Sequence, residues 1–208
     1  MHKLTFVVLC LALMATGALA QTTDLMFSEY IEGSGNNIAL EIYNGTEDAI
    51  NLGDYTIERY ANGSTTPVSI VLNAVDLAAG TVYIIANPSA DAGLLAVADQ
   101  TDSEINFSGN DALVLKFGGS TVIDSFGRVG EDPDNYWSCD DGTTANHTLR
   151  RLSSICEGDT TVDDVFDPCD EWAFAPIDVF SGLGSHISDC GAVGNEFTSW
   201  GQLKAAYR

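Results

Sequence analysis

The stretch from Leu25 to Tyr55 most constrains what this chain can fold into. Two runs within it, 25–31 and 38–43, alternate apolar with polar or acidic side chains, and the turn-forming string GSGNN separates them. Alternation with a period of two is typical of half-buried strands, so the pattern predicts a β-hairpin with a long loop. Short runs at 49–52 and 55–60 follow after brief breaks. Four strands so close together leave no room for helical crossovers, which predicts an antiparallel sheet.

Six strings of the chain then carry a family resemblance. They are FSEYIEGSGNNIALEIYNGT with INLGDYTIERYANG, GTVYIIANPSA, INFSGNDALVL, IDSFGRVGEDPDNYW and NHTLRRLSS, in this order over residues 24–155. Together they resemble the bacterial lamin tail domain family. The resemblance implies an immunoglobulin-like antiparallel β-sandwich in a secreted protein. It implies no single activity, because one fold hosts many functions and relatives carry this domain beside nuclease, phosphatase or other hydrolase modules.

Three polar residues of the first hairpin are interpreted as structural. Glu29 and Glu41 lie in the strings EY and LEIYN, and Glu41 falls in the middle of a strand, where a carboxylate needs a partner. We expect both to accept hydrogen bonds from backbone groups or from Asn36 and Asn37 in the turn. Asn44 begins the Asn-Gly-Thr break that ends the second strand.

The first 20 residues have the features of a secretory signal peptide. An apolar run from Leu4 to Met14 follows one lysine, and the segment ends in the small-residue string Ala-Leu-Ala. The run is shorter than the roughly 20 residues that a membrane span needs, so no transmembrane span is expected after cleavage. Cys10 lies inside the apolar run, which argues against a lipid anchor.

The charge of the chain disfavours nucleic-acid binding. The formal net charge is −22, from 30 acidic and 8 basic residues. Nucleic-acid affinity depends mainly on Lys and Arg that neutralise phosphates, and only Arg128, Arg150 and Arg151 approach a basic grouping. An acidic surface also keeps secreted proteins soluble, and this is the simpler explanation of the charge.

Residues 21–190 are predicted to form one sandwich domain. Further short strands are expected at 68–72, 81–87, 112–117 and 122–126, separated by clusters of Gly, Asn, Pro and Asp. The apolar piece from Ala90 to Ala98 is expected to form a short helix that covers one end of the sandwich. Few strand signals remain after Trp137, so we expect loops there.

Four cysteines remain after cleavage, and an even number in an exported chain indicates disulfides. Three pairings are open from the sequence; proximity along the chain favours Cys139 with Cys156 and Cys169 with Cys190. The alternative is a zinc site that uses His147 or His186. It is disfavoured because no CxxC or HxxxH spacing is present.

Acidic residues crowd the same C-terminal half. The strings GEDPDNYW and CDDGTTANH offer carboxylates and amide oxygens on flexible loops, which are the ligands that calcium prefers. A structural calcium site is the sharper hypothesis and solvated acidic loops the simpler one. The candidate ligands are Asp132, Asp134, Asp140 and Asp141.

No catalytic motif stands out in the sequence. The chain lacks a GxSxG elbow, an HExxH motif and a phosphate-binding glycine loop. Strand glutamates could supply a carboxylate pair for glycoside hydrolysis, but alternate strand positions normally face solvent, so surface placement is expected. Tyr136 and Trp137 could contribute to a sugar-binding face; packing against the disulfide-rich segment is the simpler role for Trp137.

Residues 191–208 differ from the rest of the chain. A glycine-containing link leads to Glu196–Arg208, where Trp200, Leu203 and Tyr207 would share one face of a short helix. A docked helix and a C-terminal sorting tag are both consistent with this pattern. The sequence as a whole predicts a secreted, non-catalytic interaction or adhesion module that needs no cofactor other than structural calcium. Its partner would be a protein, an extracellular polymer or a second copy; the alternative is an accessory or minimal extracellular hydrolase.

Overall fold

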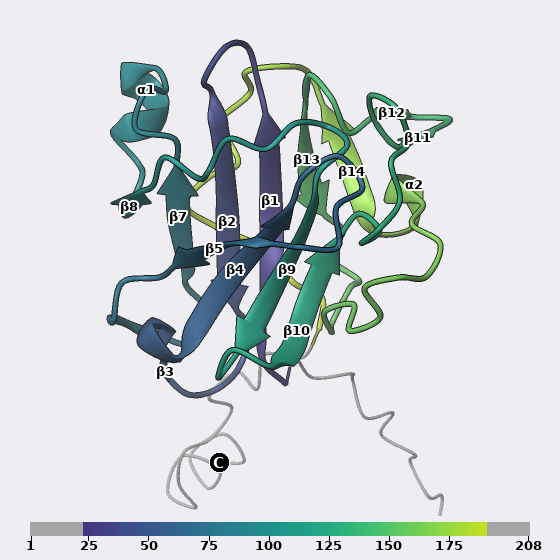
Figure 1. The fold of residues 1–208 in the computed structure, drawn as a ribbon. Coiled ribbons are helices and arrows are strands. Elements are labelled where there is room, and N and C mark those ends of the chain that lie inside the picture. The colour runs from purple at the N-terminus through teal and green to yellow at the C-terminus, as the bar shows by residue number, and fades with distance from the viewer. Residues whose placement is uncertain (1–22, 191–208) are drawn as a thin grey trace, which may run out of the picture.

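The computed structural model describes residues 23–190, which form two β-sheets packed face to face (Figure 1). The expected all-β, immunoglobulin-like β-sandwich is confirmed. The expected signal peptide, residues 1–20, and the expected helix or sorting tag within 191–208 lie outside the described residues. No helix in the described part of the chain is long and apolar enough to cross a membrane.

The larger sheet has six strands in the order β14-β13-β1-β2-β7-β8. All neighbours are antiparallel except β7 and β8, which pair in parallel. The short helix α1 (Ala92–Leu95) lies between these two strands in the sequence and belongs to the crossover that a parallel pair requires. The strands are β1 (Leu25–Glu32), β2 (Ile38–Asn44), β7 (Val82–Ala86), β8 (Gln100–Thr101), β13 (His147–Arg151) and β14 (Trp172–Ala175).

The smaller sheet has four antiparallel strands in the order β10-β9-β4-β5, and it lies in front of the larger sheet in Figure 1. Its strands are β4 (Tyr55–Tyr60), β5 (Val68–Val71), β9 (Ala112–Phe117) and β10 (Thr121–Phe126). Two small antiparallel pairs and two further short helices complete the described chain. They are β3 (Ile50–Asn51) with β6 (Asp76–Leu77), β11 (Ser138–Cys139) with β12 (Gly142–Thr143), η1 (Leu52–Asp54) and α2 (Pro168–Glu171).

The β1–β2 hairpin has the expected long loop, and a β-bulge at Ser28 shifts the pairing between Phe27 and Glu29. Because a bulge inserts one extra residue into a strand, Phe27 and Tyr30 can both face the core although they are three positions apart. The ring of Tyr30 stacks between two phenylalanines, with centroid distances of 4.9 Å to Phe107 and 4.1 Å to Phe126. The bulge therefore sets which side chains of β1 enter the core.

The outer face of the larger sheet is also covered. Residues 176–190, here called the cover segment, run across the side of β1 and β2 that faces away from the smaller sheet (Figure 1). Phe180 and Leu183 of this segment join a second apolar cluster with Ile31, Ala39 and Leu94 of α1. The helix expected between Ala90 and Ala98 is thus present in shortened form and packs on this outer face.

Four strands, β11, β12, β13 and β14, form in the region after Trp137, where loops were expected. β13 lies between β1 and β14 in the larger sheet, and Arg150 of β13 is directly opposite Glu29 of β1. Most of residues 138–190 is loop, as expected, but the prediction missed β13 because this strand contains two adjacent arginines, which are uncommon on covered strands. Arg151 is 3 % exposed, and ion pairs with Asp124 and Glu171 stabilise its charge in this position.

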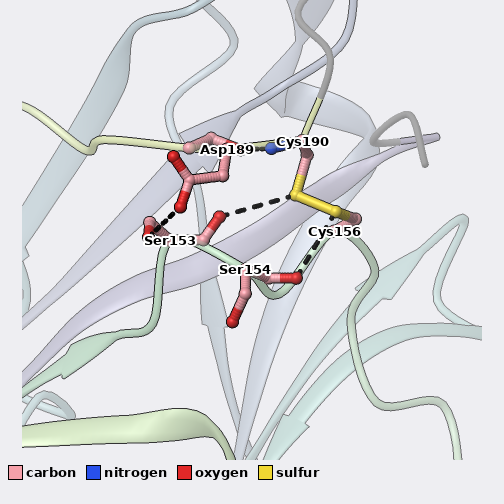
Figure 2. The surroundings of a disulfide bond; sticks show 6 residues. Ser153, Ser154, Cys156, Asp189 and Cys190 are labelled. Atoms are coloured by element: carbon pink, nitrogen blue, oxygen red, sulfur yellow. Dashed lines mark hydrogen bonds between the residues drawn. A yellow bond between two sulfur atoms is a disulfide. The ribbon is translucent and has the colours of Figure 1, made fainter. Parts of the chain in front are cut away.

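The four cysteines form two disulfides with a crossed connectivity. Cys139 pairs with Cys169 and Cys156 pairs with Cys190, so the pairing favoured from proximity along the chain was wrong. The first bond joins β11 to α2, and the second ties the end of the cover segment to the loop after β13. Figure 2 shows the second bond, beside which the Ser153 hydroxyl donates a 2.6 Å hydrogen bond to the Asp189 carboxylate.

Candidate functional site

A cavity with a volume of about 410 Å³ lies between the larger sheet and the cover segment. We call it the cleft. Strands β1, β2 and β13 form its floor, and the cover segment forms its other wall. The residues that define its chemistry are Ser28, Glu29, Glu41, Arg150, Ser181 and His186.

Two buried carboxylates occupy the floor of the cleft. Glu29 and Glu41 are directly opposite each other on β1 and β2 and are 2 % and 1 % exposed. Glu41 accepts hydrogen bonds from the Ser28 hydroxyl (2.7 Å) and from the main-chain N–H of Gly184 (2.6 Å). Glu29 forms an ion pair with Arg150, with 3.4 Å between Oε2 and Nε. Burial of both carboxylates differs from the solvent-facing placement that is usual for alternate strand positions.

Of the two kinds of donor expected for these carboxylates, a main-chain N–H is present at Glu41, whereas Asn37 of the turn does not donate to either glutamate. Asn37 is engaged elsewhere, because its amide group donates to Asp91 and to Asp178 of the cover segment. Asp178 also accepts hydrogen bonds from the main-chain N–H and the hydroxyl of Ser34, and these bonds hold the pKa of Asp178 below its usual value. The β1–β2 turn therefore binds the start of the cover segment instead of the buried glutamates.

Burial sets the charge of the cleft. Loss of hydration raises the pKa of Glu29 to about 7, and the nearby Glu41 carboxylate adds to this rise while Arg150 opposes it. Burial also raises the pKa of Glu41 above its usual value. Burial lowers the pKa of His186, which favours the neutral imidazole. Near neutral pH the facing glutamates therefore carry less than two full negative charges.

Two glycines let the cover segment approach the glutamates closely. A Cβ atom at Gly182 would overlap both Arg150 Nε and Glu29 Oε2, so only glycine fits here without a shift. Gly184 has φ of 97°, in the region that favours glycine, and its N–H binds Glu41. Any larger residue at Gly182 would have to separate the segment from the ion pair.

The serines and histidines near the cleft make hydrogen bonds and ring contacts with other partners. The hydroxyl of Ser28 donates to Glu41 and that of Ser153 to Asp189, and no serine in residues 23–190 is hydrogen-bonded to a histidine. The ring of His186 instead lies 4.8 Å from that of Tyr43. A glycosidase needs carboxylates that reach its substrate, whereas the cover segment separates these from solvent. The arrangement is suited to holding the cover segment on the sheet.

Asn44 is fully buried at the end of β2. Its amide group donates to the carbonyl oxygens of Asp48 and Leu77, both at 2.9 Å, and its Oδ1 accepts from the main chain and the hydroxyl of Thr46. These bonds fix the loop that follows β2 against the start of the next small pair of strands.

The four aspartates expected to bind calcium do not meet at one point. Asp132 and Asp134 lie in the loop between β10 and β11, whereas Asp140 and Asp141 lie in the β11–β12 turn. Within residues 23–190, the one group of three or more His, Cys, Asp or Glu side chains with ligand atoms within 4.8 Å of one another contains Cys139, Cys169 and Asp167. Its two cysteines form a disulfide.

The two aromatic candidates have separate surroundings. Trp137 is 6 % exposed, and its ring meets that of Phe166 edge-on at 5.5 Å. Phe166 lies between Cys156 and Cys169 in the sequence, so Trp137 packs against the disulfide-rich segment as expected. Tyr136 is 43 % exposed.

Several residues that line the cleft or hold the cover segment over it were not identified from the sequence. Arg150 was considered as part of a basic grouping and His186 as a zinc ligand, while Asp178, Gly182 and Gly184 received no role. The string SGLGS, residues 181–185, was the available signal, because closely spaced glycines often mark a close approach of the backbone.

All five basic side chains in residues 23–190 are in ion pairs with carboxylates. Arg59 pairs with Glu104 and Asp111, and Lys116 pairs with Glu58 at 2.7 Å. Arg150 pairs with Glu29, Arg151 pairs with Asp124 and Glu171, and Arg128 pairs with Glu131 at 3.9 Å. The described surface therefore presents many unpaired carboxylates and no unpaired Lys or Arg.

Comparison with known proteins identifies one relationship. A family model described as Lamin Tail Domain matches residues 18–130, slightly more than half of the chain. No curated protein and no solved structure matches.

Proposed function

This chain belongs to the lamin tail domain family, and from that premise we propose that it is a non-catalytic interaction module that acts outside the cell and binds a positively charged protein or surface polymer. The family's immunoglobulin-like fold is compatible with a binding role and does not require an active site. Two surface features of the chain decide which partner it can bind: the edge strands of its sheets and the negative charge of its described surface.

The open edge of strand β5 is the observation that carries the proposal. β5 is the last strand of the smaller sheet, and the side chains of Val68 and Val71 are 40 % and 65 % exposed. An edge strand offers unpaired main-chain groups to which an extended segment can add. At the end of this edge, the main-chain oxygen of Val71 accepts a hydrogen bond from Gln100 Nε2, so this oxygen is not free to pair with an added strand.

The opposite edge of the same sheet is better protected. The carboxylate of Asp124 in β10 accepts hydrogen bonds from the main-chain N–H groups of Phe27 and Asp159. Gly158 packs so closely on β10 that a Cβ atom there would overlap the Ile123 carbonyl oxygen. The two edges therefore differ, and β5 is the favoured contact surface.

Charge supports a basic partner. Because the basic side chains of the described residues are all paired internally, an approaching molecule meets mainly carboxylates. Polyphosphates are repelled by such a surface, which disfavours nucleic acids. A second copy of the chain is also repelled at low ionic strength, so self-association would need salt to screen the charge. The two disulfides support an extracellular location, because disulfides persist in oxidising compartments.

The alternative function is an accessory or minimal extracellular hydrolase. The feature in its favour is the pair of facing glutamates, because the pKa of Glu29 near 7 is suited to a general acid. Burial of both carboxylates argues against it. Turnover assays with nuclease, phosphatase and glycosidase substrates would decide, and activity lost in Glu29→Gln would favour the hydrolase.

Two matched variants test the interaction module. Val71→Lys adds a charge to the open edge, and Val165→Lys adds the same charge at a valine that is 83 % exposed in a distant loop. Immobilised wild-type and variant proteins would be exposed to extracellular proteins and to purified surface polymers from the source cells. We expect a bound component that survives Val165→Lys and is lost with Val71→Lys. Equal retention by all three proteins would exclude the β5 edge, and equal loss in both variants would indicate a contact governed by net charge alone.

A further inference from the structure

The cleft contains buried polar atoms that have no hydrogen-bond partner among residues 23–190. They are Glu29 Oε1, Arg150 Nη2 and His186 Nε2, and all three residues line the cleft. The ion pair between Glu29 and Arg150 uses the other carboxylate oxygen, Oε2, and the guanidinium Nε. Buried polar atoms are normally paired, because burial removes their hydrogen bonds to water. These atoms therefore point to a ligand of the cleft.

The size and the lining of the cleft suit a small polar ligand. Its volume of about 410 Å³ lies within the roughly 300 to 1,000 Å³ of small-molecule sites. The hydroxyl groups of Ser181 and Ser185 line it on the side of the cover segment. Both serines are exposed, and neither side chain makes a hydrogen bond to another described residue. Small-molecule sites are usually more apolar than this one, so a ligand with polar groups on several sides is favoured.

Charges of both signs line the cleft and disfavour an ion as the ligand. Glu29 and Glu41 would repel an anion, whereas Arg150 and Arg151 would repel a cation. Each of the two arginines is already paired with carboxylates in the described chain. A neutral molecule avoids the repulsion that an ion of either sign would meet.

A hydroxyl group matches all three unpartnered atoms. The guanidinium nitrogen of Arg150 is a donor in every state. The Glu29 oxygen accepts when the carboxyl group is ionised and donates when it carries the proton, and the role of His186 Nε2 depends on the tautomer. Because a hydroxyl both donates and accepts, it fits each atom in either form. A compact neutral molecule with several hydroxyls is a sugar ring.

We propose that the cleft binds one neutral sugar ring. The Arg150 guanidinium donates to one sugar hydroxyl, and Glu29 and His186 bond to others on the same ring. The serine hydroxyls of the cover segment bond to the side of the ring that faces away from the sheet. This site is independent of the β5 edge, which belongs to the smaller sheet.

The attachment of the cover segment allows the ring to enter. Asp178 binds the β1–β2 turn at the start of the segment, and the disulfide of Cys190 fixes its end. Within residues 179–188 of the described chain, the segment's one hydrogen bond to the sheet runs from Gly184 N–H to Glu41. An outward shift of this middle part uncovers the unpartnered atoms while both ends stay attached.

NMR titration of the purified full chain tests the site, with glucose, galactose, mannose and N-acetylglucosamine as the probes. We expect at least one of these sugars to bind with a dissociation constant on the order of 10⁻³ M and to shift the amide signals of Gly182 and Gly184. Acetate, methylammonium and glycine are the anionic, cationic and zwitterionic comparisons, and each should bind more weakly. The methyl glycoside of the bound sugar separates two sources of the ring: equal affinity would identify the end of a polysaccharide, and lost affinity a free monosaccharide.

Two matched arginine variants test the contacts. Arg150→Lys keeps the positive charge beside Glu29 and removes the guanidinium donors, so it should weaken sugar binding at least about tenfold. Arg128→Lys makes the same change in the exposed ion pair with Glu131, outside the cleft, and should bind as the wild type does. Melting curves without sugar would show that both variants are folded.

A second pair of variants removes hydroxyls that support nothing else in the described fold. The double variant Ser181→Ala with Ser185→Ala should weaken binding several-fold, whereas Ser120→Ala, in the exposed turn between β9 and β10, should not. Val71→Lys should leave sugar binding unchanged, so failure of the β5 edge and failure of the cleft can be told apart. Three results would overturn the inference: no sugar binds at millimolar concentration, an ion binds more tightly than every sugar, or Arg150→Lys and Arg128→Lys bind alike.

Discussion

Replacing Glu29 with glutamine should flatten the pH dependence of stability. In the folded protein, burial opposite Glu41 raises the pKa of Glu29 from 4.5 to about 7. In the unfolded chain the side chain is hydrated, so its pKa returns to the ordinary value. The folded protein therefore holds a proton through a pH range in which the unfolded chain has released it.

The sign and size of the effect follow from proton linkage. Between pH 4.5 and pH 7 the folded state binds more protons than the unfolded state, so the free energy of unfolding decreases as the pH rises. The penalty is absent below the unfolded pKa and is fully present above the folded pKa. Because one pKa unit corresponds to about 1.4 kcal/mol, the loss assigned to Glu29 is about 3 kcal/mol. Glu29→Gln stays neutral at every pH and removes this loss.

Urea unfolding followed by circular dichroism, at several pH values from 4 to 8, measures the effect as a difference between wild type and variant. The other groups that face Glu29 are present in both proteins, so the titrations of Glu41 and His186 largely cancel in this difference. We expect the variant to gain about 3 kcal/mol relative to the wild type from the acid to the alkaline end. A constant urea slope would show that the unfolded reference state is unchanged.

Direct titration provides the second readout. Carbon NMR of the carboxyl groups should show one glutamate signal with a midpoint near pH 7 in the wild type and no such signal in Glu29→Gln. Because Glu29 and Glu41 interact, the midpoint belongs to the pair, and the variant decides the assignment. A Glu29 midpoint near 4.5, or a stability difference that does not change with pH, would refute the reasoning.

Two further predictions concern the parts that hold the sheets together. Asp124→Asn should cost about 3 to 5 kcal/mol in urea unfolding, because the fully buried Arg151 loses its buried charged partner and keeps only the 30 % exposed Glu171. Glu171→Gln should cost about 1 kcal/mol or less, because that partner is partly exposed and Asp124 remains. Equal costs would contradict the importance of burial. Replacing Cys156 and Cys190 together with serine should cost about 4 kcal/mol, because their separation of 34 residues closes a long loop in the unfolded chain; an unchanged unfolding midpoint would contradict it.

The second strand of the hairpin that opens the fold was predictable because a large apolar side chain recurs at every second position. Every second residue from Ile38 to Ile42 is apolar, and these residues do enter the core. The family resemblance extended the prediction to both sheets, since it rests on strings spread over most of the described chain. The bulge at Ser28 was not predictable, because nothing in a run of strand-forming residues marks where a partner strand skips one position.

The candidate site was less predictable because its burial depends on a segment distant in sequence. Glu29 and Glu41 alternate with apolar residues as solvent-facing side chains do, and they are buried because residues 176–190 cover that face. Arg150 and Arg151 likewise gave β13 the composition of a loop. Arg150 and Arg151 fit on a covered strand because each pairs with a carboxylate that is distant in the sequence. The local sequence around β13 does not indicate such pairing.

The crossed disulfides make residues 139–190 resistant to release by a single cut. With Cys139 bonded to Cys169 and Cys156 to Cys190, any one peptide bond between residues 139 and 190 is spanned by at least one disulfide. A protease that nicks this loop-rich region once would leave the two fragments covalently joined, and they would separate on a gel only after reduction. Sequential pairing would instead have left residues 156–169 as a point where one nick divides the chain, so the connectivity protects the integrity of the molecule where regular structure is sparse.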